Sequence, residues 1–130
     1  SRLKGDDFLR IEENGYLNGL VDLIFRTNEK YYIVDWKSNI LGGFPEGFGH
    51  SEIEKEMFSH HYVLQYHLYV LATHLFLSGR MEDYSYERNF GGVYYLFVRG
   101  MKVGTGQGIY FDLPDFETIQ AMENFLVPKT

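Results

Sequence analysis

Residues 31–37 read YYIVDWK, a run of aromatic and β-branched residues that predicts a strand. Strand side chains alternate between two faces, so Asp35 and Lys37 share one face while Trp36 lies on the other. We therefore expect a carboxylate and an ammonium on the same side of a sheet.

The preceding segment, residues 16–25 (YLNGLVDLIF), predicts another strand, and a polar turn at residues 27–30 joins the two into a hairpin. Residues 7–12 are a candidate pairing partner for this hairpin. Asp22 stands between apolar neighbours, so Asp22 and Asp35 are both expected to emerge from half-buried segments. A buried carboxylate is costly unless a cation or strong donors accompany it.

The rest of the chain alternates between helical and strand patterns. Residues 52–77 predict one long helix that ends at Ser78-Gly79-Arg80, and residues 115–125 predict a closing helix capped near Asp115. Residues 93–98 (VYYLFV) and residues 109–111 predict short strands. The glycine-rich segments 39–51 and 102–108 predict loops, the first of them mobile.

Composition limits the classes of protein that fit. A chain of 130 residues with 45% hydrophobic residues fits a single globular domain, residues 1–130. The chain has no cysteine, which excludes disulfides, thiolate zinc sites and iron–sulfur clusters and is compatible with a cytoplasmic location. No apolar run reaches the roughly 20 residues that span a bilayer, and no signal peptide opens the chain, so no membrane association is expected.

The formal net charge is −6 at pH 7, and no basic patch is evident. A protein that holds a polyanion unaided usually has a basic surface. If DNA is the substrate, another component must therefore deliver it, or a metal must offset the local negative charge. Residues 1–14 lack the apolar stripe of a complete helix, so we expect a fragment of a larger protein.

Asp22, Asp35 and Lys37 form the constellation with the most chemical content. A hard cation such as Mg²⁺ prefers oxygen ligands and typically takes one or two protein carboxylates. An ammonium beside it can stabilise the charge that develops on a phosphate or position the attacking water. The alternative is a structural Asp35–Lys37 ion pair with Asp22 as a turn or edge residue.

The predicted long helix offers a second element. Gln65 and Tyr69 are four residues apart and share one face, with Tyr62 one turn earlier, so this face could approach the strand ends and touch a phosphate. The alternative is that Tyr62, Leu68, Tyr69 and Ala72 form a core stripe with Gln65 at its polar edge.

Two further patterns favour ordinary structural roles. His60, His67 and His74 recur every seven residues, but only His60 with Glu56 has the spacing of a metal-binding pair, so surface or packing histidines are expected. Residues 104–108 (GTGQG) resemble a phosphate-binding loop but lack the Walker lysine–serine pair and a following helix, which indicates a plain loop.

Four segments together carry a family resemblance, which runs from about Gly15 to Gly100. GYLNGLVDLIFR, YYIVDWKSNILG, HHYVLQYHLYVLATH and FGGVYYLFVRG resemble the C-terminal nuclease domain of the RecB family, within the PD-(D/E)XK nuclease superfamily. The resemblance implies an α/β restriction-endonuclease-like core of three layers, with a central mixed sheet flanked by helices. The long helix would pack against the hairpin sheet.

The resemblance also implies an activity: Mg²⁺-dependent exonucleolytic cleavage of DNA in double-strand break repair and recombination. It is ATP-dependent in a full complex whose RecC-like and RecD-like subunits and helicase motors feed single strands. The implied site residues are the metal-binding acids Asp22 and Asp35, the Trp36 carbonyl as a further ligand, the catalytic Lys37, and the helix motif Gln65 and Tyr69.

Two features of the sequence limit the resemblance. The family's metal-binding histidine lies on a helix upstream of the first acid and has no match before Asp22, so we expect it in chain that precedes Ser1. The absence of cysteine excludes the iron–sulfur branch of related nucleases. The alternatives are a protein-docking platform that loads the recombinase RecA, with little activity in isolation, and a standalone repair or restriction endonuclease of the same superfamily.

Overall fold

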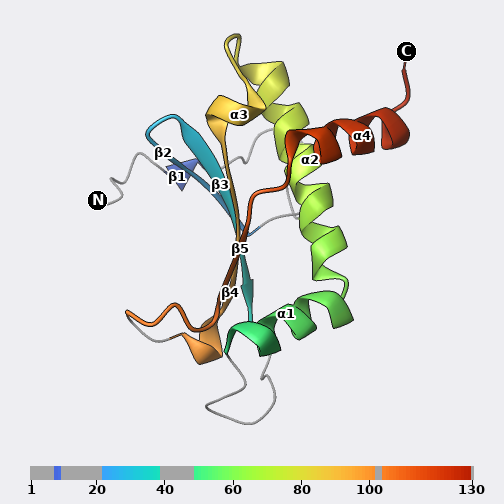
Figure 1. Cartoon of the computed structure of the whole chain (residues 1–130). Helices are drawn as coiled ribbons and strands as arrows, with labels where there is room; N and C mark the ends of the chain where they lie inside the picture. The colour runs from blue at the N-terminus through green and yellow to red at the C-terminus, as the bar shows by residue number, and fades with distance from the viewer. Residues whose placement is uncertain (1–7, 10–21, 39–48, 102–103, 130) are drawn as a thin grey trace.

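The computed structural model describes residues 8–9, 22–38, 49–101 and 104–129; the remaining residues are drawn in grey in Figure 1. The elements, in chain order, are β1 (Phe8–Leu9), β2 (Leu23–Thr27), β3 (Lys30–Lys37), α1 (His50–Ser59), α2 (Tyr62–Arg80), α3 (Tyr86–Asn89), β4 (Phe90–Phe97), a 3₁₀ turn (Val98–Gly100), β5 (Ile109–Asp112) and α4 (Phe116–Leu126).

The strands form one mixed sheet in the order β1-β2-β3-β4-β5. Only the β3–β4 pair is parallel, and α1, α2 and α3 provide the crossover that a parallel pair requires. The predicted hairpin is confirmed: β2 and β3 pair around a turn in which Asn28 has a φ of 56°, a value that asparagine tolerates better than most residues. β1 pairs with β2 inside the expected partner segment, residues 7–12.

The bounds of all four predicted strands differ from the expectations; β3 begins at Lys30, one residue before the predicted start. β2 begins at Leu23 and extends to Thr27, while residues 16–21 of the predicted strand lie outside the described residues. β4 begins at Phe90 rather than at Val93 and ends before Val98, where the 3₁₀ turn starts. β5 extends by one residue, to Asp112. The earlier start of β4 brings Gly91 and Gly92 into the sheet.

The prediction of one helix over residues 52–77 is wrong. Two helices, α1 and α2, are separated at His60 and His61, and His61 has a left-handed φ of 57°. A straight helix over those residues would be about 40 Å long, whereas the eight-residue strand beneath it spans about 26 Å. The break lets α1 turn back so that Ile53 and Met57 are 1% and 0% exposed in the same core as α2.

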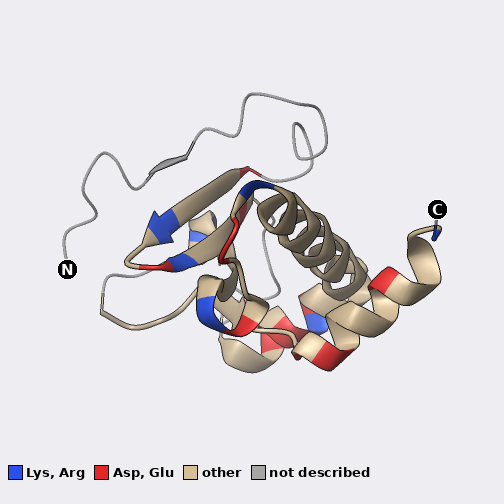
Figure 2. Ribbon diagram, turned by 90° about the horizontal axis from the view of Figure 1, so that it is seen from above, with Lys and Arg blue, Asp and Glu red and all other residues tan. Residues whose placement is uncertain are grey.

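The described helices α1, α2 and α4 lie on one side of the sheet (Figures 1 and 2). The mixed sheet with packed helices confirms the α/β class, and α2 packs on the sheet as expected. A second helical layer is not found within residues 22–38, 49–101 and 104–129. The core between sheet and helices includes Ile33, Val93, Tyr95, Phe97, Met57, Tyr66, Val70 and Ile119.

The opposite face of the sheet carries a row of aromatic rings. Adjacent centroids are 5.1, 6.0 and 4.7 Å apart along the row Phe25, Tyr32, Tyr94 and Phe111. A β-bulge between Tyr31 and Tyr32 leaves Gly91 without a direct partner. A Cβ at Gly91 would lie 2.4 Å from the Tyr32 ring, and one at Gly92 would lie 2.4 Å from the Phe111 ring. The glycine pair therefore makes room for two rings.

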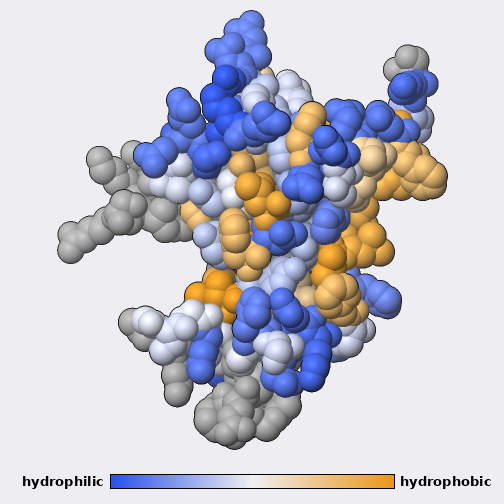
Figure 3. Space-filling view, in the orientation of Figure 1, coloured by the Kyte–Doolittle hydropathy of each residue, from blue (hydrophilic) through white to orange (hydrophobic). Residues whose placement is uncertain are grey.

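The closing helix α4 begins after Asp115, as predicted, although the Asp115 side chain makes no capping hydrogen bond. α4 packs on α2, and its far end is apolar and exposed: Phe125 is 88% exposed, and Figure 3 shows the corresponding hydrophobic surface. The described part of the loop at 104–108 consists of turns and irregular backbone. No helix among the described residues is long and apolar enough to cross a membrane.

Candidate active site

Asp35 is the buried acid of the site. It shares the core-facing side of β3 with Ile33, is 4% exposed, and lies in register with Tyr95 on the parallel strand β4. The Nζ atom of Lys37 lies 3.0 Å from its Oδ1 atom. This contact is an ion pair rather than a well-directed hydrogen bond, because Oδ1 has no hydrogen-bond partner among the described residues. The Lys37 ammonium is thus the cation that accompanies the buried carboxylate.

The charges around Asp35 act in opposite directions. Burial raises the pKa of Asp35, the close contact with Lys37 and its positive charge lower it, and the negative charge of Asp22 raises it again. Burial is the strongest of these effects, so the pKa is raised on balance. A second cation at this position would favour the ionised form further.

Asp22 differs from Asp35 in its surroundings. Both acids adjoin partly buried strands, as expected, but Asp22 itself lies immediately before β2 and is exposed, whereas Asp35 is buried. Its Oδ2 atom accepts a hydrogen bond from the backbone N–H of Trp36 at 2.8 Å. This bond holds Asp22 across the hairpin, one residue away from Asp35. That the Trp36 carbonyl is a further metal ligand stays a prediction.

Lys37 lies beside two aromatic rings as well as Asp35. Its Nζ atom is 4.4 Å from the ring centroid of Tyr62 on α2 and 5.4 Å from that of Tyr95 on β4. An ammonium is attracted to the face of an aromatic ring, and more strongly when water is excluded. Because the Lys37 side chain is only 17% exposed, these rings and Asp35 restrict where the charge can point.

Gln65 and Tyr69 are on the α2 face that meets the site. The Oε1 atom of Gln65 accepts a hydrogen bond from the Tyr95 hydroxyl at 2.7 Å. Tyr69, one turn further along α2, lines the same pocket as Gln65, and its pKa is raised, first by burial and then by the negative charges of Asp35 and Asp22. The structure therefore brings the two acids, the lysine and this helix face together. Their catalytic roles stay predictions.

The alternative interpretation of this helix face as a core stripe fails for one member. Leu68 is 42% exposed, and with Leu64, 59% exposed, it lines an open pocket of about 430 Å³. Gln65 and Tyr69 line the same pocket, as do His60 and His61 in the turn before α2. A space large enough for part of a ligand thus adjoins the polar face of α2.

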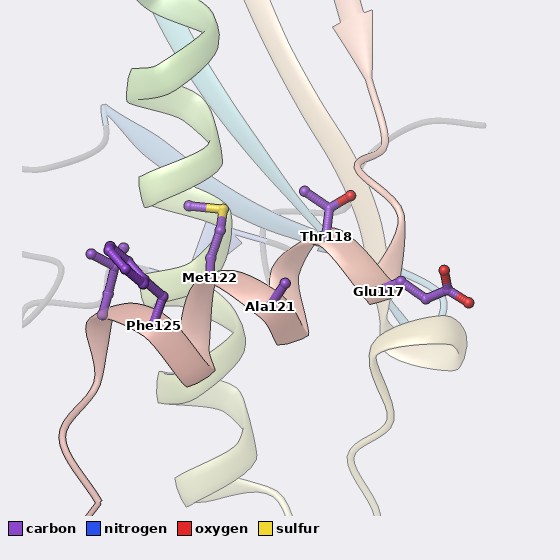
Figure 4. Close-up of a pocket in the computed structure, with 6 residues that line it drawn as sticks. Glu117, Thr118, Ala121, Met122 and Phe125 are labelled. Atoms are coloured by element: carbon purple, nitrogen blue, oxygen red, sulfur yellow. The ribbon is translucent and has the colours of Figure 1, made fainter.

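A second pocket lies along α4 (Figure 4). It has a volume of about 510 Å³ and is lined by Glu117, Thr118, Ala121, Met122, Phe125 and Leu126. None of the residues singled out from the sequence lines it. With a single carboxylate and a mostly apolar lining, it does not offer the oxygen ligands that a hard cation prefers.

The histidines take structural positions, as expected. His60 Nε2 is 2.9 Å from a Glu56 carboxylate oxygen, His67 Nδ1 contacts the Val63 carbonyl, and His74 Nδ1 lies 2.9 Å from the Tyr84 hydroxyl. Within the described ranges, no group of three or more His, Cys, Asp or Glu side chains is close enough together to hold a metal ion.

The acid pair nevertheless has the chemistry of a Mg²⁺ site. Mg²⁺ keeps several waters and needs only one or two carboxylates from the protein. Asp35 offers a buried carboxylate beside the Lys37 ammonium, and Asp22 is held next to it by the Trp36 N–H. The residues therefore fit a hard divalent cation.

The charged residues do not form a basic surface in the described part of the chain. Figure 2 shows Lys and Arg as separate segments interspersed with Asp and Glu. Of the basic residues, Lys37 is committed to the site, and Lys30 bonds the carbonyls of Glu87 and Arg88. This arrangement agrees with the net charge of −6.

No family model matches the chain. Among curated proteins, RecB of the Haemophilus influenzae RecBCD enzyme is 43% identical over 109 residues, which is 84% of this chain. RecB of Escherichia coli K12 is 41% identical over 125 residues, or 95% of this chain. RecB of Mycobacterium tuberculosis H37Rv is 43% identical over 98 residues, or 75% of this chain. The matched span belongs to the RecB family.

The chain spans only about a tenth of the length of these RecB relatives, between 9% and 10% of each. The segments that resemble the RecB family include Asp22, Asp35, Lys37, Gln65 and Tyr69. Tyr95 is the site residue that sequence reasoning missed. Its segment indicated only a buried strand, and nothing local signals that β4 places Tyr95 next to Asp35.

Proposed function

We propose that this chain is a Mg²⁺-dependent DNA nuclease domain that belongs to a longer, ATP-dependent helicase–nuclease acting in double-strand break repair and recombination. Two observations support the proposal. The chain is related to RecB over most of its length. Asp22 and Asp35 lie side by side on one hairpin with the Lys37 ammonium 3.0 Å from the buried acid.

Each residue of the site has a proposed role. Asp22, Asp35 and the Trp36 carbonyl would hold Mg²⁺, which, when bound, supplies positive charge to the scissile phosphate and favours deprotonation of water. Lys37 stabilises the negative charge that develops on the phosphate, and the rings of Tyr62 and Tyr95 limit the movement of its ammonium. Gln65 and Tyr69 present polar groups from α2 to the same phosphate.

The partners follow from the names of the relatives and from the charge. Because the relatives are RecB subunits of RecBCD enzymes, we propose RecC-like and RecD-like partner subunits and DNA as substrate. With a net charge of −6, this chain would depend on those partners to deliver the strand. Helicase activity and ATP binding would belong to the rest of the protein. A cytoplasmic location and RecA docking stay predictions.

The first experiment replaces the ammonium. In the full-length protein assembled with its partners, Lys37→Ala should lower Mg²⁺-dependent degradation of single-stranded DNA by roughly 10²-fold or more, because one preorganised charge at the phosphate is lost. ATP hydrolysis should be unchanged. The matched control is Lys30→Ala, at the other end of β3, whose ammonium bonds two main-chain carbonyls. Wild-type cutting by Lys37→Ala would contradict the proposal.

The second experiment locates the metal without relying on activity. Fe²⁺ bound in place of Mg²⁺ reduces added hydrogen peroxide to hydroxyl radicals, with ascorbate restoring Fe²⁺. The radicals cut the nearby backbone, and the fragments should map to residues around Asp22 and Asp35. Asp22→Asn and Asp35→Asn should each abolish the cuts, while the exposed control Asp83→Asn should retain them.

A pure docking platform would give no local cuts in the wild-type protein. A standalone endonuclease would degrade DNA without ATP or partner subunits.

A further inference from the structure

Tyr95, on β4, lies between Asp35 on the neighbouring strand β3 and Gln65 on the helix α2. It is 0% exposed and lies in register with Asp35 on the neighbouring strand. Its hydroxyl donates to Gln65 Oε1 at 2.7 Å, and its ring lies 5.4 Å from the Lys37 Nζ atom. One buried side chain thus bonds Gln65 on α2 and places its ring beside the Lys37 ammonium of β3.

The direction of the hydrogen bond determines what Gln65 can do. A tyrosine hydroxyl has one proton to donate, and the other acceptor that the structure gives it, the Tyr62 carbonyl, is 3.5 Å away. The shorter bond therefore uses Gln65 Oε1 and leaves the amide NH₂ of Gln65 as a double donor. An NH₂ group suits a phosphate oxygen, whereas the amide oxygen would repel it.

The geometry points to Tyr95 as a positioning residue: by holding Gln65 Oε1, it turns the Gln65 NH₂ group toward the phosphate that is cut. This inference rests on the proposed nuclease function and assigns Gln65 the role of hydrogen-bond donor to the substrate. Tyr95 does not touch the substrate itself. It acts through Gln65 and, with its ring, beside Lys37.

Another buried tyrosine in the same core, Tyr66, serves as the comparison for a purely structural role. Tyr66 is also buried, at 2% exposed, and its ring lies 5.9 Å from that of Tyr95. Its hydroxyl donates to Asp112 on β5 and contacts no residue of the proposed site. Tyr66→Phe and Tyr95→Phe each remove one buried hydroxyl and keep the ring, and Tyr66→Phe removes the bond to a carboxylate, so it is the more demanding control for lost stability.

The test uses the full-length protein with its partner subunits. Tyr95→Phe should lower kcat for DNA cleavage about tenfold, as expected for the loss of one oriented hydrogen-bond donor, with an unchanged KM for DNA. Fe²⁺-directed backbone cuts around Asp22 and Asp35 should be as strong as in the wild type. Tyr66→Phe should retain the wild-type kcat.

A double-mutant cycle tests whether Tyr95 acts through Gln65. In a Gln65→Ala background, Tyr95→Phe should have no further effect on kcat, because the group it positions is absent. Gln65→Glu can still accept from Tyr95 but has no NH₂ group, so it should lose at least as much activity as Gln65→Ala.

The outcomes separate the inference from the proposed function. Additive effects of Tyr95→Phe and Gln65→Ala, or equal losses in Tyr66→Phe and Tyr95→Phe, would overturn the positioning role. A wild-type kcat for Tyr95→Phe would do the same, provided that Lys37→Ala is inactive. If Lys37→Ala also cuts at the wild-type rate, the proposed nuclease function itself fails.

Discussion

Two carboxylates of the same residue type occupy different environments in this site. Asp35 is buried and has a raised pKa, while Asp22 is exposed and accepts a main-chain hydrogen bond. Burying Asp35 costs stability, and the Lys37 ammonium, 3.0 Å from its Oδ1 atom, offsets part of that cost. Because a buried ion pair is a weak source of stability, a binding role explains the two charges better than folding does.

A histidine outside the site should make stability depend on pH. Burial lowers the pKa of His74, and the charge of Glu123, whose Oε2 is 3.9 Å from Nε2, opposes that shift. The unfolded chain therefore binds a proton that the folded chain does not, so stability should fall as the pH drops below about 6.5, by at most about 1.4 kcal/mol per pH unit. Above about pH 6.5, His74 should no longer make stability depend on pH.

Urea unfolding of the chain at pH 7.5 and pH 5.5 would measure this dependence. His74→Gln, which can still contact the Tyr84 hydroxyl but does not titrate, should remove part of the difference between the two pH values. The exposed His50 is the control, and His50→Gln should leave the difference unchanged. An undiminished pH dependence in His74→Gln would contradict the assignment.

At the scale of the elements, β4 has two different faces. One places Val93, Tyr95 and Phe97 in the core beneath α2, each 0% exposed. The other has Gly91 and Gly92 against the rings of Tyr32 and Phe111. The glycines let the rings lie close to the strand, and the bulge beside them sets the register that brings Tyr95 next to Asp35. The packing on one face thus supports the site on the other.

A methyl group on this strand should therefore destabilise the fold. Gly91→Ala places a Cβ 2.4 Å from the Tyr32 ring and should lower the free energy of unfolding by about 1–3 kcal/mol. The control is Gly79→Ala in α2, where nothing lies within 4 Å of the new Cβ, and which should raise stability by about 0.5–1 kcal/mol. Denaturant unfolding would measure the loss of stability in Gly91→Ala and the gain in Gly79→Ala. Equal changes in the free energy of unfolding would argue against the contact with the Tyr32 ring.

For the whole molecule, the important quantity is charge. The chain has 12 basic and 18 acidic residues, and the described basic residues are scattered rather than gathered (Figure 2). In the proposed function the site residues would act on a phosphate, while the described part of the chain shows no basic surface that would hold a long strand. DNA cleavage would then be carried out by this chain, and DNA binding would depend on its partners.

Salt dependence tests that division. The affinity of this chain for single-stranded DNA, measured by fluorescence anisotropy in Ca²⁺, should change less than about tenfold between 50 and 200 mM salt, whereas a protein with 6–10 phosphate contacts loses about 10³–10⁵-fold. The assembled full-length complex should show the steeper dependence. A steep dependence for this chain alone would mean that it grips DNA unaided.

The sequence by itself determined the features that depend on local periodicity. The hairpin, the buried position of Asp35 and the shared face of Asp35 and Lys37 follow from the two-residue repeat of a strand, and the structure confirms each of them. The spacing of Gln65 and Tyr69 likewise puts both on one face of α2.

Only the tertiary structure decided which segments meet. The parallel pairing of β3 and β4 joins residues about 60 positions apart, and it alone places Tyr95 beside Asp35 and beneath Gln65. The helix breaks at His61, which is neither glycine nor proline, because α1 must turn back over the sheet to bury Ile53 and Met57. Local patterns report the face on which a side chain lies, whereas contacts between distant segments depend on how the whole core packs.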